Sequence, residues 1–131
     1  MIVVDSSAWV EFLRKTESPV HRRLRELIDS EADLAVTEVV VMELLGGAGA
    51  GRVNLRDRLL AYPLLPLQGL KDYEAAASIY DRCRRAGDTL KHGYMDCLIA
   101  VPALRTGASL LHDDADFEVI ARHTDLELLT S

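Results

Sequence analysis

Short apolar runs alternate with helix-like patterns along almost the whole chain of 131 residues. The apolar runs predict buried strands at residues 2–4, 34–36, 64–67, 109–111 and 126–129. Between them, apolar residues recur at three- and four-residue steps, which predicts helices over 8–14, 19–30, 38–46, 52–61, 70–86, 94–105 and 116–122. This alternation predicts an α/β fold, with a central, mostly parallel β-sheet and helices on both of its faces.

Length and composition favour one globular domain over residues 1–131. No apolar run approaches the roughly 20 residues that a membrane span needs, and the N-terminus lacks a basic segment followed by an apolar one. We therefore expect a cytoplasmic protein that does not use a membrane. Cys83 and Cys97 form no C-x-x-C pair, so we expect two buried thiols and no disulfide framework.

The formal net charge of −6 at first disfavours a nucleic-acid partner, because phosphate binding depends on Lys and Arg. That argument depends on where the acids lie. If several of them surround divalent cations, the working surface is much less negative than the total charge.

Acidic residues lie at the ends of two of the predicted strands. Asp5 directly follows residues 2–4, and the run His112-Asp113-Asp114 follows residues 109–111. In open parallel sheets, ligands bind beyond the carboxyl ends of the strands. Two carboxylates about 4 Å apart repel by about 4 kcal/mol at an effective dielectric near 20. A solvated turn is one interpretation, and a shared cation is the other.

Two further acids lie on predicted apolar helix faces. Asp96 shares a face with Ile99 and Ala100, and Glu43 follows Val39 by one turn. A carboxylate is costly to bury without a partner. Each is either a core acid paired with an Arg or part of a cation site. Together with the strand-end acids they favour Mg²⁺ or Mn²⁺, which take oxygen ligands.

Patterns of other catalytic sites are missing. His21, His92, His112 and His123 lack an H-x₃₋₅-H spacing, and only His112 adjoins the acids, which disfavours zinc. There is no G-x-S-x-G, and neither cysteine has an obvious His partner. The glycine-rich residues 46–51 lack the Lys-Ser/Thr of a phosphate loop.

The order of the acids resembles that of a PIN domain, and specifically of the short VapC-type toxins of prokaryotic toxin–antitoxin pairs. The resemblance covers essentially the whole chain. It is carried by four segments: "IVVDSSAWVEFL" from residue 2, "TEVVVMELL" from residue 37, "DCLIAVPALRTGASLL" from residue 96 and "HDDADFEVIA" from residue 112.

The resemblance implies an endoribonuclease that depends on Mg²⁺, with Mn²⁺ as a substitute. It implies an RNA substrate, a homodimer and a small cognate antitoxin that neutralises the protein. Carried over by position, the catalytic and metal-binding acids are Asp5, Glu43, Asp96 and Asp114. Asp116 is a possible further metal ligand, and Ser7 stands where a hydroxyl often supports the first aspartate.

Three positions depart from the family's pattern without removing a carboxylate. His112 replaces a common Thr or Ser, Tyr94 replaces a small hydroxyl residue, and Pro102 falls inside a predicted helix. Asp113 has no assigned role, and we expect it to be solvated. Candidate phosphate contacts are Arg82, Arg84, Arg85 and Lys91.

A docking surface for an antitoxin is predicted after the first strand. Its aromatic and apolar anchors lie beside a basic run: Trp9, Phe12, Leu13, Arg22, Arg23 and Arg25. The alternative is that Trp9 and Phe12 fill the core.

Other functions fit the chain less well. A haloacid-dehalogenase-type phosphohydrolase needs a second Asp where Ser7 stands. A receiver domain needs a Lys after a late strand, and a Toprim domain places a Glu first. The remaining alternative is a catalytically inactive PIN-like domain that binds RNA or a protein partner. The retained acids disfavour it, because a pure binding module has little reason to bury charges.

Overall fold

The computed structural model describes residues 1–129, which build a five-stranded sheet in the order β3-β2-β1-β4-β5. All neighbouring strands of this sheet are parallel. The strands are β1 (Ile2–Val4), β2 (Leu34–Thr37), β3 (Leu64–Leu65), β4 (Ser109–Leu111) and β5 (Glu127–Leu128). The predicted α/β fold is confirmed, and the described sheet is entirely parallel.

Helices fill every connection between consecutive strands. They are α1 (Ser6–Leu13), α2 (Pro19–Asp29), α3 (Glu38–Gly46), α4 (Arg52–Leu59), α5 (Leu70–Arg85), α6 (Tyr94–Thr106) and α7 (Ala115–Arg122), with a short 3₁₀ helix, η1, at Gly49–Gly51. Their ends differ little from the predicted ranges, and α6 continues past Pro102. Within residues 1–129, no helix combines the length and the apolar character that crossing a membrane requires.

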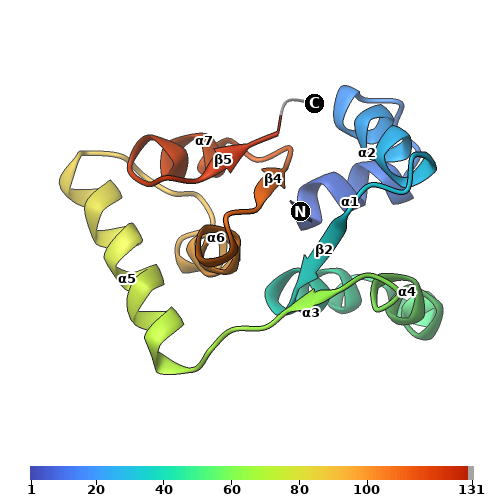
Figure 1. Cartoon of the computed structure of the whole chain (residues 1–131), viewed down its shortest axis with the longest axis horizontal. Coiled ribbons are helices and arrows are strands. Elements are labelled where there is room, and N and C mark those ends of the chain that lie inside the picture. The colour runs from blue at the N-terminus through green and yellow to red at the C-terminus, as the bar shows by residue number, and fades with distance from the viewer. Residues whose placement is uncertain (130–131) are drawn as a thin grey trace.

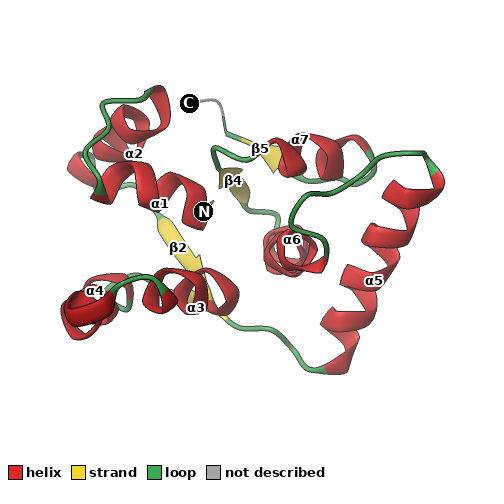
Figure 2. Ribbon diagram, turned by 180° about the vertical axis from the view of Figure 1, so that it is seen from behind, coloured by secondary structure: helices red, strands yellow, loops and turns green. Residues whose placement is uncertain are grey.

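The helices form two layers around the sheet. Helices α1 to α4 lie on one side of the strands and α5 to α7 on the other (Figure 1), as right-handed parallel crossovers require. The same two layers are seen from behind in Figure 2. Strands β1 and β4 supply the fully buried centre, with Val3, Val4, Leu110 and Leu111 almost without exposed surface. Cys83 and Cys97 are both buried free thiols, as predicted.

Three strands pass directly into a helix through an N-cap residue. The side chains of Asp5, Thr37 and Asp114 each accept a backbone N–H from the first turn of α1, α3 and α7. An N-cap oxygen satisfies one of the amide groups that a helix start leaves unpaired. Capping therefore fixes two of the predicted site acids at the carboxyl edge of the sheet.

The buried face of helix α5 contains a charged residue. Asp72 is buried on this face together with Ala76, Ile79 and Cys83, whereas Leu70 and Tyr73 are 74% and 50% exposed. The buried Asp72 forms an ion pair with Arg105 of α6. This long-range pairing lets an acid occupy the buried face near the start of the helix.

Candidate active site and metal centre

The first acid of the site, Asp5, follows β1 and is almost completely buried. Its Oδ2 accepts hydrogen bonds from the backbone N–H of Ser7 at 3.0 Å and from the Ser7 hydroxyl at 2.6 Å. Its Oδ1 is buried and has no hydrogen-bond partner within residues 1–129. Burial raises the pKa of Asp5, and the hydrogen bonds from Ser7 only partly oppose this effect. One oxygen of Asp5 is therefore fixed, and the other lacks a partner.

The turn after β4 is tied to the turn after β1. The backbone N–H of Asp113 donates to the Ser7 hydroxyl oxygen at 2.8 Å. Asp114 caps α7 by accepting the N–H of Asp116 at 2.9 Å, and its own N–H donates to His112 Nδ1 at 3.0 Å. The ring nitrogen of His112 thus helps to hold this turn.

The third acid, Asp96, lies in the first turn of α6 and is 3% exposed. Its Oδ2 is buried and has no hydrogen-bond partner among the described residues. Burial raises the pKa of Asp96 to about 9, and the nearby carboxylate of Asp114 acts in the same direction. In residues 1–129 its only ion-pair contact is with His92. The alternative of a core acid paired with an arginine therefore does not apply to Asp96.

The expectation that Glu43 is buried is wrong, because the residue is exposed. Helix α3 buries the face of Val40 and Leu44, and Glu43 lies beside that face. The hydroxyl of Ser6 donates to Glu43 Oε1 at 3.0 Å. Partial desolvation of the carboxylate raises the pKa of Glu43, Ser6 opposes this shift, and the charge of Asp5 adds to it. Glu43 thus lies on the rim of the site.

Asp116 uses both carboxylate oxygens to hold the loop between α5 and α6, which Figure 2 shows as a long connection. Oδ1 accepts the backbone N–H of Lys91 at 2.9 Å, and Oδ2 accepts that of His92 at 2.8 Å. Burial alone would raise the pKa of Asp116, but these hydrogen bonds outweigh it and hold the pKa below its ordinary value. Asp116 is therefore an ionised anchor of this loop.

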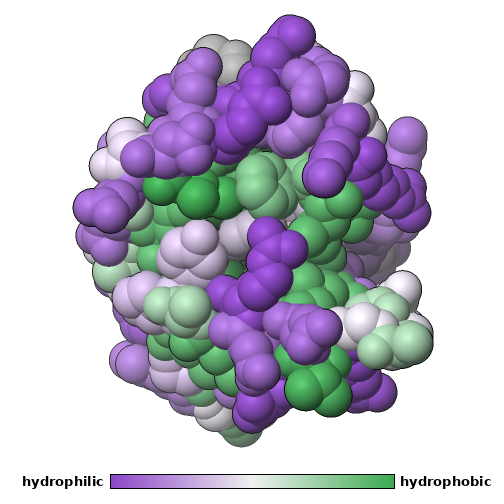
Figure 3. Space-filling model, turned by 90° about the vertical axis from the view of Figure 1, so that its right-hand side faces the viewer, coloured by the Kyte–Doolittle hydropathy of each residue, from purple (hydrophilic) through white to green (hydrophobic). Residues whose placement is uncertain are grey.

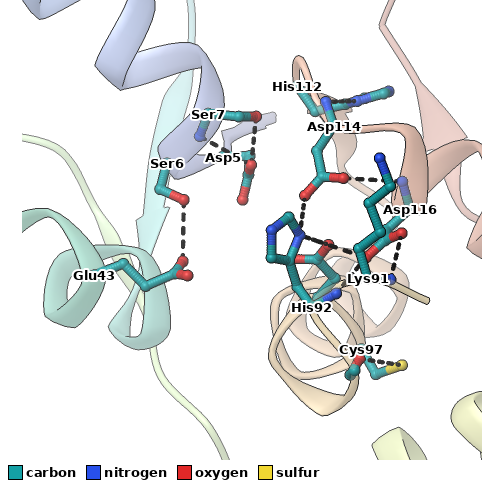
Figure 4. A network of polar contacts seen from close by, with 12 residues as sticks. Asp5, Ser6, Ser7, Glu43, Lys91, His92, Cys97, His112, Asp114 and Asp116 are labelled. Carbon is teal, nitrogen blue, oxygen red and sulfur yellow. Dashed lines mark hydrogen bonds and ion pairs between the residues drawn. The ribbon is translucent and has the colours of Figure 1, made fainter.

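His92 was missed by the reasoning from sequence, which singled out His112. The Nδ1 atom of His92 lies 2.9 Å from Asp114 Oδ2 and 3.4 Å from Oδ2 of both Asp96 and Asp116 (Figure 4). These four side chains form a group whose ligand atoms all lie within 4.8 Å of one another. The sequence held one signal for it, because His92 and Asp96 are four residues apart at the start of a helix.

His92 and most of the acids described above line one cavity of about 330 Å³. In Figure 4, Asp5 and Glu43 lie on one side of it and His92 and Asp114 on the other. Its walls comprise Asp5, Ser6, Ser7, Val10, Glu11, Glu43, His92, Asp96, Asp113 and Asp114. In residues 1–129 no Lys or Arg side chain forms an ion pair with any of these acids. Such a cluster could bind a metal ion, which would neutralise the repulsion between the carboxylates.

Comparison with known proteins identifies the family. The sequence model of the family "PIN: PIN domain" matches residues 2–123. The chain belongs to the PIN domain family.

This PIN domain has relatives with similar sequences over nearly their whole length. It is 44% identical over 130 residues to "Ribonuclease VapC11" of Mycobacterium tuberculosis and to "VapC ribonuclease Mb1587" of Mycobacterium bovis. In both cases the match covers 97% of this chain and 96% of the relative.

Solved structures confirm the fold of this PIN domain. A VapBC-1 structure from nontypeable Haemophilus influenzae matches with a TM-score of 0.76 and 17% identity, covering 98% of this chain and 97% of that one. A VapBC2 structure from Rickettsia felis, bound to a promoter DNA fragment, matches with a TM-score of 0.73 and 18% identity, covering 98% of each chain.

The PIN domain brings four of the predicted acids to one cavity: Asp5, Glu43, Asp96 and Asp114. Asp116 does not line this cavity, but it belongs to the group of four close side chains that includes His92, Asp96 and Asp114. Asp113 is exposed, as expected for a solvated residue, although it also lines the cavity. His112 lies at the edge of the site, and its Nε2 is 3.5 Å from Glu118.

Proposed function

We propose that this chain is a divalent-metal-dependent endoribonuclease that acts in the cytoplasm as the toxin of a toxin–antitoxin pair. One observation of the structure carries the proposal: Asp5 Oδ1 and Asp96 Oδ2 are buried without a hydrogen-bond partner in residues 1–129, and both residues line one cavity with other acids. Leaving such atoms unpaired is costly unless a ligand binds them. The relatives named as ribonucleases support hydrolysis of RNA as the reaction.

The donor set suits Mg²⁺ or Mn²⁺, because carboxylate oxygens are the ligands that these cations prefer. Asp5, Glu43, Asp96 and Asp114 would hold the metal. Bound there, it would activate a water molecule and neutralise charge on the scissile phosphate. Ser7 keeps one oxygen of Asp5 fixed, so the carboxylate loses little freedom when it binds a cation.

The RNA backbone needs a cationic contact near the cavity. Of the predicted phosphate contacts, Arg82 donates to the carbonyl of His123, and Arg85 pairs with Asp81. Lys91 is exposed, forms no ion pair within residues 1–129, and directly precedes His92. The remaining candidate, Arg84, lies over the ring of Tyr80. We assign the phosphate contact to Lys91, because Asp116 holds its backbone N–H beside the acidic cluster.

The purified protein should cleave single-stranded or structured RNA in the presence of Mn²⁺, and EDTA should stop the reaction. Asp5→Asn should retain the helix cap, because Asn is also a good N-cap residue, and yet lose activity by about 100-fold or more. Gel analysis of a labelled RNA checks both points. Asp113→Asn is the matched control, since it alters an exposed acid of the same cavity, and it should cleave normally. Equal cleavage by Asp5→Asn and wild type would contradict the proposal.

An inactive domain that only binds RNA or protein is the other candidate. The buried oxygens of Asp5 and Asp96 that lack hydrogen bonds favour the enzyme, because a binding surface gains nothing from them.

We propose that the antitoxin docks in a groove between α1, α2 and α4. Trp9 does not take part, because it is 3% exposed and packs against Phe12 and Tyr62 in the core. The groove has a volume of about 280 Å³ and is lined by Phe12, Leu13, Lys15, Glu17, His21, Arg25, Ile28, Asp29 and Arg58. The face that carries helices α1 to α4 shows a band of apolar surface between polar regions (Figure 3).

The rim of this groove carries cations without partners. Lys15 and Arg58 form no ion pair within residues 1–129, whereas Arg25 pairs with Glu17 at 3.2 Å. An antitoxin segment with apolar and acidic side chains would complement both the groove and its rim. The similar structures named as toxin–antitoxin complexes support a protein partner of this kind.

Arg58→Glu should weaken binding of the cognate antitoxin about tenfold or more, because a like charge would then face the acidic segment. Isothermal titration of the purified partners measures the change. Arg56→Glu is the matched control on the same helix, since Arg56 does not line the groove, and it should bind as wild type does. Equal losses for both variants would point to a general charge effect and would contradict docking at this groove.

A second copy of the chain would cover another apolar surface. Met42, Tyr73 and Met95 are 52%, 50% and 37% exposed and line one groove between α3, α5 and α6. Exposed apolar patches of this kind mark association surfaces. We propose this groove as the homodimer interface.

A further inference from the structure

The acidic cavity contains one nitrogen ligand among its oxygens, and nothing in the residue pattern of the family assigns it a role. His92 lies on the loop before α6, and its side chain is 58% exposed. An exposed histidine on a loop ordinarily points to solvent. Here Nδ1 instead lies within 2.9–3.4 Å of three carboxylate oxygens (Figure 4).

The backbone around His92 is built to hold this position. The carboxylate of Asp116 accepts the N–H groups of Lys91 and His92, which fixes the main chain just before the ring. Gly93 then has a φ of 56° and lets the chain turn into α6. Other residues rarely adopt this conformation, so the turn depends on glycine. The ring of His92 therefore reaches Asp96, which lies in the first turn of the helix that follows.

The distances match the spacing of ligands around one ion. Imidazole nitrogens and carboxylate oxygens bind first-row or Mg²⁺-like cations at about 2.1 Å, so neighbouring ligands of one ion lie about 3.0–3.4 Å apart. Nδ1 lies 2.9 Å from the Asp114 oxygen and 3.4 Å from the Asp96 oxygen. The Asp96 oxygen in this contact is the buried Oδ2 that lacks a hydrogen-bond partner.

We propose that His92 Nδ1 is a ligand of the metal, so that this site is a mixed nitrogen–oxygen centre that selects Mn²⁺ over Mg²⁺. The inference rests on the proposed metal-dependent function and adds a ligand to it. Nitrogen ligands favour transition metals, whereas Mg²⁺ keeps oxygen ligands and water.

A different role for His92 makes the opposite prediction. If the ring is only a positive counter-ion to the acids, a metal would displace it, and removal of the ring would leave metal affinity unchanged or raise it. The two roles are therefore separated by the sign of the effect on Mn²⁺ affinity.

The test uses the purified full chain with Mn²⁺ as the probe. Electron spin-echo spectroscopy of the Mn²⁺ complex should show a nitrogen coupling, which should change when histidine carries the heavier nitrogen isotope. In His92→Gln the coupling should vanish, Mn²⁺ affinity should fall about tenfold, and Mg²⁺ affinity should change little. His123→Gln is the matched control, because His123 pairs with Asp88 and does not line the acidic cavity. It should retain the coupling.

Each other outcome overturns the inference. Mn²⁺ that binds without a histidine coupling, or more tightly to His92→Gln, would leave the metal-dependent function standing and remove His92 as a ligand. Absence of any Mn²⁺ binding to the wild type would refute both. The isotope experiment shows without a variant whether a histidine binds Mn²⁺. Of the four histidines, His92 is the one that lines the acidic cavity, so a coupling that persists in His123→Gln assigns the ligand to His92 even if His92→Gln folds poorly.

Discussion

Asp96→Asn is expected to abolish the stabilisation of the protein by Mn²⁺. A cation that binds only the folded state at about 100 times its dissociation constant adds about 2.7 kcal/mol, or about 10 °C in melting temperature for a chain of this size. Asn keeps the volume of Asp96 but removes its charge, so the variant should show almost no shift. RNA cleavage should fall by about 100-fold or more in the same variant. Differential scanning fluorimetry with and without Mn²⁺ measures the first effect.

In EDTA, where no metal is bound, Asp96→Asn should also change how the folding stability depends on pH. The pKa of Asp96 is raised to about 9, so between its ordinary pKa and about 9 the folded state holds a proton that the unfolded state has lost. Its contribution to stability is therefore full at acidic pH and declines as the pH rises towards 9. Asp96→Asn lacks this decline, so its stability should depend less on pH than that of the wild type. A full Mn²⁺ shift in the variant would show that Asp96 does not hold the cation.

Arg105→Met is expected to cost about 3–5 kcal/mol of folding stability, because it leaves the carboxylate of Asp72 buried without its cation. Asp72 is 4% exposed, and Arg105 also donates to the carbonyl of Pro66 at 2.7 Å. Methionine retains much of the apolar stem, so the effect comes mainly from the lost charge. Urea unfolding measures the change, and cleavage by the remaining folded protein should be normal.

Arg85→Met is the matched control for this pair. Arg85 lies 2.9 Å from Asp81 on the surface of α5, with a side chain that is 80% exposed. A surface pair of this kind contributes at most about 1 kcal/mol. If Arg105→Met cost no more than Arg85→Met, the buried pair would have no special role. Adding Asp72→Asn to Arg105→Met should recover part of the lost stability, since the uncompensated charge is then gone.

The sequence predicted the layered fold well because the alternation of strands and helices is a local pattern. It also predicted which edge of the sheet carries the acids, since Asp5 and Asp114 directly follow strands. The face that each helix buries was harder to predict. Glu43 lies beside apolar residues in the chain, yet its position on α3 leaves it at the cavity rim. Burial of one residue depends on how helices pack, and this is a long-range property.

His92 and the buried Asp72 of α5 show more clearly that long-range contacts cannot be predicted from local spacing. His92 reaches the acids because Asp116, which is 24 residues away, holds its backbone N–H. Asp72 turns inward because Arg105, which is 33 residues away, pairs with it. Both contacts join segments that a spacing argument treats separately, so neither leaves a periodic signal.

Under the proposed toxin function, the capping role of Asp5 and Asp114 determines how the gene can be inactivated under selection. Mutations at either position that let a cell survive an unneutralised toxin fall into two kinds, depending on whether the new residue can still cap the helix. Asn keeps the cap oxygen, so the product remains folded and still able to occupy its antitoxin. Substitution by Ala or Val removes the cap as well as the acid and costs about 0.5–2 kcal/mol of folding stability, so less folded product remains to occupy the antitoxin. Escape mutants at these codons should therefore differ in how much antitoxin they still sequester, with the Asn variants sequestering the most.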